Sequence, residues 1–249
     1  MTYCLGIKTR EGLMGLADTR ITSGTQTTTA RKIFTVNRPS HSYFIMTSGL
    51  RSVRDKVLTY FREKTEGSSF RSNKLYMTAN TFSEQVKRVA REDKEALEEA
   101  NLSFNLYAIL GGQLESDSKP KLYLVYPQGN WIEIGEDSPY AVIGNTGFGR
   151  PILQRSLSFG QDLEFAMKTA FLSFDITRLS CNDVGYPVDS LILRNDSYHI
   201  LEHRFQREEL SHISNFWESR LRGAINQLPA DAFQKALYER EVTPIKLSS

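Results

Sequence analysis

The sequence predicts an α+β fold in which two antiparallel β-sheets stack on each other and helices cover both outer faces. Strand-like segments come in three groups, within residues 2–49, 103–144 and 188–205. A pair of helix-like segments separates each group from the next, and two more helix-like segments end the chain. Strands that follow one another without intervening helices favour antiparallel sheets, and grouped helices suit the outer faces of two stacked sheets.

The first fifty residues are predicted to form strands and turns only. Residues 2–9 and 12–21 are β-rich, and the Arg-Glu-Gly turn between them predicts a hairpin. Residues 22–30 are polar and predict a hairpin or loop. Two further strands are expected over residues 31–37 and 42–49, the second ending at Gly49.

Two helices are predicted next. Residues 49–64 carry Val53, Val57 and Phe61 at helical spacing. The second helix is expected over residues 81–100, where Thr81 and Glu84 form a candidate capping box. Its apolar face consists of Phe82, Val86, Val89 and Leu97.

The remainder of the chain repeats the same kinds of segment. Strands are predicted over 103–112, 120–127, 130–135 and 139–144, helices over 149–157 and 162–174, strands over 188–195 and 198–205, and helices over 207–228 and 230–240. No linker rich in Pro, Gly or Ser divides them. We therefore predict one domain over residues 1–206 and a C-terminal helical extension of that domain over 207–249.

Composition and charge exclude several classes of protein. The net charge of +2 over 249 residues suggests neither a nucleic-acid partner nor a membrane partner. Neither a signal peptide nor an apolar run of membrane-spanning length is expected, and Cys4 and Cys181 do not form a disulfide or metal-binding pattern, so a cytoplasmic protein is predicted. The usual phosphate-loop, dinucleotide and zinc motifs are missing from the sequence, so we expect no cofactor and no metal.

The chemistry points to the second residue. If Met1 is removed, Thr2 carries both a hydroxyl and a free α-amine, whose pKa is ordinarily about 7.7–8.0. Such a residue is a nucleophile and its own general base. It needs a cation nearby to keep the amine unprotonated, and a carboxylate to hold that cation. Lys32 and Asp18 lie on predicted neighbouring strands and are candidates for these two roles. Each of these residues alone has an ordinary explanation, and the signal is their combination.

At this point the sequence resembles a known family. TYCLGIKTREGLMGLADTRITSG, followed by RKIF, is similar to the start of proteasome β-type subunits, above all the bacterial ancestral β-subunit group called Anbu. IGNTGFGRPIL at 143–153 and CNDVGYPVD at 181–189 resemble later motifs of that group. The resemblance covers about the first 200 residues. It implies an N-terminal-nucleophile fold, which is a four-layer αββα sandwich.

The resemblance also implies roles for individual residues. Thr2 would be the nucleophile, Lys32 would tune its amine, Asp18 would orient Lys32, and the Gly49 backbone N–H would stabilise the oxyanion. Family members carry a serine in a Gly-Ser-Gly turn and an Asp-x-x-Ser-Gly motif. This chain departs from both, and it offers Thr146, with Asn145 as the alternative, for the first and Asp183 or Asn182 for the second.

The implied function is a threonine-type endopeptidase that forms an acyl-enzyme on Thr2 and works within a self-compartmentalising homo-oligomer, either a ring or an open helical ring. The expected partners are peptide or unfolded-protein substrates, with an ATPase or accessory protein as a further partner. Two alternatives stay open. One is a non-peptidase N-terminal-nucleophile amidohydrolase, and the other is a non-catalytic scaffold subunit if Met1 is retained.

Overall fold

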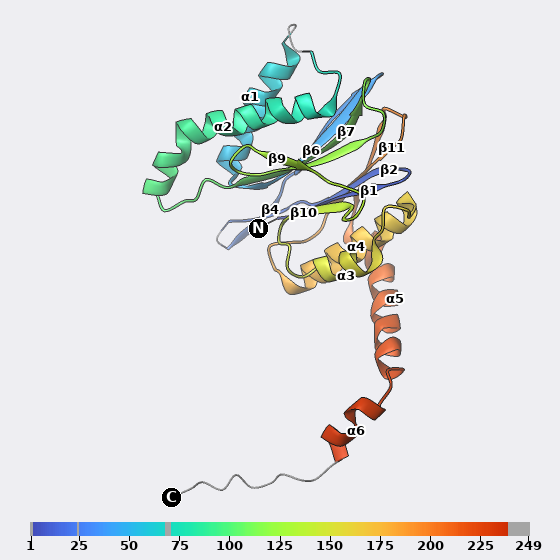
Figure 1. The fold of residues 1–249 in the computed structure, drawn as a ribbon. Coiled ribbons are helices and arrows are strands. Elements are labelled where there is room, and N and C mark those ends of the chain that lie inside the picture. Colours follow the sequence, from blue (N-terminus) through green and yellow to red (C-terminus); the bar gives the residue numbers. More distant parts are fainter. Residues whose placement is uncertain (1, 24, 68–70, 239–249) are drawn as a thin grey trace, which may run out of the picture. The chain divides into compact units, whose positions relative to one another are not determined.

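The computed structural model describes residues 2–23, 25–67 and 71–238 of the chain. The chain divides into two compact units, Met1–Glu209 and Leu210–Ser249. The first unit contains two five-stranded sheets (Figure 1). All strand pairs in both sheets are antiparallel, as the sequence predicts.

The first sheet carries the start of the chain, with β1 as the second of its five strands. Its strands, in spatial order, are β10 (Tyr140–Gly144), β1 (Tyr3–Thr9), β2 (Gly12–Asp18), β11 (Val188–Arg194) and β12 (Ile200–Phe205). The second sheet consists of β5 (Ile33–Arg38), β6 (His41–Gly49), β7 (Leu106–Leu114), β8 (Lys121–Val125) and β9 (Trp131–Glu133).

Helices cover the outer faces of the two sheets (Figure 1). α1 (Arg51–Glu66) and α2 (Leu75–Glu99) pack on the β5–β9 sheet through a core that includes Phe61 and Phe82. α3 (Arg150–Ser156) and α4 (Leu163–Ser180) lie on the other sheet. Between the sheets, a second core joins Leu13 of β2 to Phe44 and Ile109. Each such side chain contributes about 1.5–3 kcal/mol on full burial. The order of helices, sheet, sheet and helices confirms the predicted four-layer sandwich.

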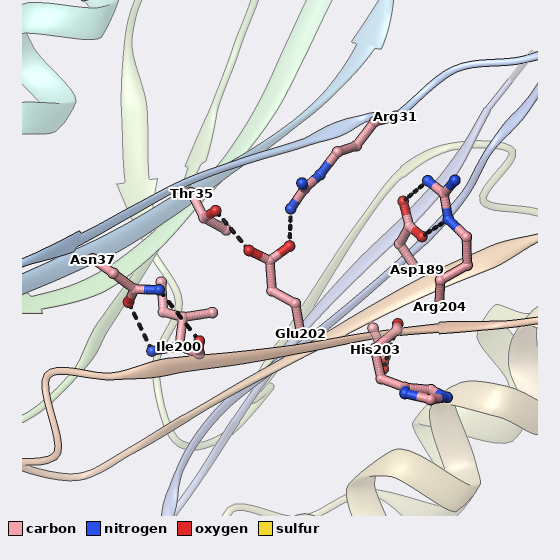
Figure 2. A network of polar contacts seen from close by, with 9 residues as sticks. Arg31, Thr35, Asn37, Asp189, Ile200, Glu202, His203 and Arg204 are labelled. Carbon is pink, nitrogen blue, oxygen red and sulfur yellow. Dashed lines mark hydrogen bonds and ion pairs between the residues drawn. The ribbon is translucent and has the colours of Figure 1, made fainter.

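Polar contacts join the two sheets along one edge, where β5 and β12 lie side by side (Figure 2). The Thr35 hydroxyl donates to Glu202 at 2.7 Å, and Arg31 forms an ion pair with the same carboxylate. The Asn37 side chain both donates to and accepts from the backbone of Ile200. Side-chain contacts thus link β5 and β12, which belong to different sheets.

The polar segment over residues 22–30 is a hairpin, in which β3 (Arg20–Ser23) pairs with β4 (Gln26–Thr29). The strand predicted over 12–21 therefore breaks at Thr19. The helix predicted to end at 174 continues to Ser180.

The predicted capping box at Thr81 is wrong, because α2 begins six residues earlier at Leu75. Thr81 lies inside the helix, and its hydroxyl donates to the Met77 carbonyl at 3.0 Å. The first helical N–H, that of Leu75, donates instead to the Asp117 carboxylate at 2.9 Å. A residue far along the chain thus caps this helix.

The second unit contains most of α5 (Arg207–Asn226) and all of α6 (Asp231–Tyr238). Both helices expose large apolar side chains, among them Phe216, Ile225 and Phe233. No helix in the described ranges combines the length and apolar character that a membrane span requires.

Candidate active site

A buried ion pair lies at the end of β2, beside the start of β1. The Asp18 carboxylate and the Lys32 ammonium are 2.7 Å apart, and both residues are buried. The oxygen that binds Lys32, Oδ1, also accepts the backbone N–H of Tyr3 at 2.8 Å. Lys32 donates further to the Arg20 carbonyl at 2.7 Å. Asp18 therefore holds both the cation and the backbone of the strand that follows Thr2.

Burial governs the electrostatics of this pair. It raises the pKa of the Asp18 carboxyl, while the Lys32 ammonium and the backbone N–H groups of Tyr3 and Gly185 act against that rise. Two charges out of water are stable only when both are paired and hydrogen-bonded. Here each charge has the other and at least one backbone partner, so the ion pair meets this condition.

The first residues of the chain are anchored on several sides. The Thr2 carbonyl accepts the Asn145 N–H at 2.7 Å. The Tyr3 hydroxyl lies 2.6 Å from the hydroxyl of Ser173 on α4. Ser173 gives its single hydrogen to the Gly149 carbonyl at 2.7 Å, so Tyr3 is the donor to Ser173. These contacts fix Thr2 relative to β10 and α4.

Gly144, at the end of β10, allows the close approach of Thr2. Its φ is +88°, a conformation that favours glycine, and an added Cβ would lie 1.9 Å from the Thr2 carbonyl oxygen. Only a residue without a side chain fits there.

Thr2 and Lys32 line a cavity of about 740 Å³. The end of β6 forms part of its wall, including Thr47, Ser48 and Gly49. Gly49 has a φ of +146°, and an added Cβ would lie 1.9 Å from the Asn105 carbonyl oxygen. The structure therefore brings Thr2, Lys32 and Gly49 to one cavity, with Asp18 buried behind Lys32.

The other two candidate site residues, Thr146 and Asp183, are not among the residues that line this cavity. Thr146 is exposed and lines a separate cavity of about 420 Å³ beside β8–β10. Its neighbour Asn145 reaches Thr2 through the backbone hydrogen bond described above. Asp183 lies in the turn between α4 and β11. In that turn the Asn182 carbonyl accepts from the Arg20 guanidinium at 2.8 Å.

Sequence reasoning missed several residues of the site. Arg20, Arg51 and Arg54 also line the cavity, and Ser173 supports Tyr3 from 170 residues away. Arg51 and Arg54 could have been found from their place two and five residues after Gly49. Nothing in the sequence links Ser173 to the start of the chain.

The arrangement suits nucleophilic chemistry at a carbonyl. It places a threonine, a buried ammonium and a glycine backbone around one cavity. Within the described ranges, no group of three or more His, Cys, Asp or Glu residues is placed to hold a metal ion. Met1, on whose removal the α-amine depends, lies outside the described residues.

Comparisons with known proteins agree with this geometry. The model of the proteasome subunit family matches residues 2–183. No curated protein sequence gives a match. Among solved structures, the Gly-1 mutant of Anbu from Hyphomicrobium sp. strain MC1 is 28% identical, with a TM-score of 0.85 over 92% of this chain and 98% of that one.

Two further structures are equally similar. Anbu (ancestral β-subunit) from Yersinia bercovieri is 28% identical, with a TM-score of 0.84 over 91% of this chain and 97% of that chain. The helical assembly of the Anbu complex from Pseudomonas aeruginosa is 29% identical, with the same TM-score and coverage. The αββα sandwich is thus the N-terminal-nucleophile fold of proteasome subunits. The chain belongs to the proteasome subunit family, and the solved structures that it resembles are those of Anbu, the ancestral β-subunit.

Proposed function

We propose that this protein is a threonine-type endopeptidase whose nucleophile is Thr2, exposed by removal of Met1. The observation that carries the proposal is the shared Asp18 oxygen, which binds both the Lys32 ammonium and the N–H of the residue that follows Thr2. A buried charge pair is weak support for stability alone. Its place beside a threonine that lines a cavity supports a catalytic role.

In the proposed reaction, the Thr2 amine takes the proton of the Thr2 hydroxyl, and Oγ1 attacks the carbonyl carbon of the substrate. The carbonyl oxygen gains negative charge and is stabilised by the Gly49 N–H. The C–N bond then breaks, and the proton passes to the departing amine. Water attacks the resulting ester, releases the acid and restores the hydroxyl. Thr146, or alternatively Asn145, is proposed to take the place of the family's serine near the nucleophile, and Asp183 or Asn182 is proposed to orient the Thr2 amine.

In this scheme Lys32 controls the protonation state of the Thr2 α-amine. An α-amine has a pKa of about 7.7–8.0, and a neighbouring positive charge disfavours its protonated form. The Lys32 ammonium would therefore keep a larger fraction of the amine available as a base near neutral pH. Asp18 acts as a positioning residue, since it holds Lys32 and does not face the cavity.

The family points to an assembly. The solved Pseudomonas aeruginosa structure is a helical assembly of the Anbu complex. We propose that this chain likewise forms a homo-oligomer, as a ring or an open helical ring that encloses its active sites. The proposed setting is the cytoplasm, with peptides or unfolded proteins as substrates and an ATPase or accessory protein delivering them.

Intact mass spectrometry tests the proposal, before and after incubation with a β-lactone or epoxyketone that reacts with N-terminal threonine. The expected result is a mass without Met1 that gains one adduct. Thr2→Ala should give no adduct, while Thr2→Ser, which keeps a hydroxyl, should still react. Retained Met1 with no adduct would overturn the proposal and favour a scaffold role. Cleavage of small amides without cleavage of any peptide would favour an amidohydrolase.

A further inference from the structure

The cavity beside Thr2 is lined by cations. Its charged side chains are Arg20, Lys32, Arg51 and Arg54, and no Asp or Glu of the described residues lines it. We propose that this cavity selects an acidic side chain, an aspartate or glutamate on the acyl side of the bond to be cleaved. The inference rests on the proposed function and names its substrate class.

The cations exceed the carboxylates that neutralise them. Lys32 is paired with Asp18. Arg54, whose side chain is 15% exposed, donates twice to one oxygen of Asp55, at 2.7 and 2.8 Å. Arg51 lies 3.4 Å from the other oxygen of the same carboxylate. One carboxylate outside the cavity is therefore shared by two guanidinium groups, which leaves a positive charge for a ligand.

The start of α1 favours an anion at the same place. Leu50 is its N-cap and makes no side-chain capping bond, and the first turn has no acidic residue. The first N–H groups of a helix lack intrahelical partners and carry partial positive charge. Leu50 and Arg51 line the cavity, so this helix end lies at its wall.

Thr47 supplies an independent sign of a ligand. The residue is 3% exposed and lines the cavity, and its Oγ1 has no hydrogen-bond partner within the described ranges. An unpartnered buried hydroxyl is unfavourable, and a ligand carboxylate would accept its hydrogen. Thr47 also borders a smaller cavity of about 290 Å³, which adjoins the first at Lys32 and Arg54.

The order of residues in the wall indicates which substrate residue is selected. Gly49 is proposed to bind the oxygen of the scissile carbonyl, and Leu50 and Arg51 follow it directly. The side chain on the residue that bears this carbonyl would therefore enter beside the start of α1. A glutamate there could accept hydrogen bonds from guanidinium groups, which bind carboxylates with strong, directional bonds.

Matched fluorogenic peptides that differ only at this residue test the inference. We expect kcat/KM for Glu to exceed that for Gln by about tenfold or more, equal to about 1.4 kcal/mol, and the ratio to shrink as salt is raised. Arg54→Gln, Arg51→Gln and Thr47→Val should each reduce the ratio of Glu to Gln turnover severalfold. Lys64→Gln, which removes an exposed charge from the same helix, should leave the ratio unchanged.

A binding measurement separates the two proposals. In the Thr2→Ala variant, fluorescence anisotropy would compare an uncleaved peptide containing Glu with its Gln counterpart. Preferential binding of the Glu peptide would support selection of an acidic side chain, provided that Arg54→Gln abolishes this preference. This result would hold even if the wild-type protein cleaves no peptide. Equal binding of the two peptides, or no binding of either, would overturn it, as would a preference that the arginine variants leave intact.

Discussion

The buried pair of Asp18 and Lys32 allows a prediction of magnitude. Asp18→Asn leaves the Lys32 ammonium buried and without its carboxylate partner, while the hydrogen bond to the Arg20 carbonyl remains. Removing one member of a buried pair costs about 3–5 kcal/mol. A folded domain has only about 5–15 kcal/mol in total, so this variant should lose a large fraction of its stability.

Lys32→Met should cost less, toward the lower end of that range. The Asp18 carboxylate still accepts the backbone N–H groups of Tyr3 and Arg20, and it can take up a proton. The double variant Asp18→Asn/Lys32→Met removes both charges at once. Its loss should be smaller than the sum of the single losses by about 2–3 kcal/mol, within the range measured for residues in direct contact.

Equilibrium denaturation in urea at one fixed protein concentration measures all three variants, because oligomers make stability depend on concentration. Lys121→Met is the matched control. Its ion pair with Glu133 has the same 2.7 Å distance but is partly exposed, so the loss should be at most about 1 kcal/mol. Additive losses in the double variant, or a Lys32→Met loss no larger than that of the control, would refute the reasoning.

Three more predictions concern Ser173, Gly144 and Glu92. Ser173→Ala removes the acceptor of the buried Tyr3 hydroxyl and should cost about 1–3 kcal/mol in denaturant titration; an unchanged midpoint would contradict this. Gly144→Ala, with a Cβ 1.9 Å from the Thr2 carbonyl oxygen, should slow adduct formation on Thr2 by at least about tenfold, and an unchanged rate would show that the strand end is not constrained. Hydrogen bonds from two basic side chains and a tyrosine lower the pKa of Glu92 from 4.5 to about 2. Its contribution to stability is therefore complete above pH 4.5 and is lost as the pH falls towards 2. Melting curves of Glu92→Gln should show a weaker dependence over that range, and an identical dependence would contradict the assignment.

The local pattern of strands and turns in the sequence was enough to predict the part of the site that the β1–β2 hairpin builds. β1 and β2 are joined by a short turn, so their pairing places Cys4 opposite Ala17 and brings Asp18 to the start of β1. Lys32 precedes β5, the next long strand after the hairpin. A short turn leaves few ways to pair β1 with β2, so the spacing of Thr2 and Asp18 was informative. Lys32 precedes a strand of the other sheet, so its contact with Asp18 depends on how the two sheets stack.

Distant partners could not be predicted. α2 begins at Leu75 because Asp117, 42 residues later, accepts its first N–H. The capping box that we predicted was at Thr81, which lies inside the helix. The placement of Thr146 in a second cavity likewise depends on how β10 turns after Gly144. Such contacts are set by the packing of whole layers.

The alternation of side chains along β1 explains why the site lies between the sheets. Successive residues of a strand point to opposite faces. Cys4 belongs to the core between the two sheets, so Thr2, two residues before it, faces the same side and reaches the cavity bordered by Thr47 and Gly49. Tyr3 points the other way and meets α4. A register slip of one residue would exchange these faces, pointing Thr2 at the helices and Tyr3 at the cavity. The Tyr3–Asp18 hydrogen bond and the close fit of Gly144 against Thr2 both oppose such a slip. The same contacts that hold the strand therefore decide which side chain reaches the cavity.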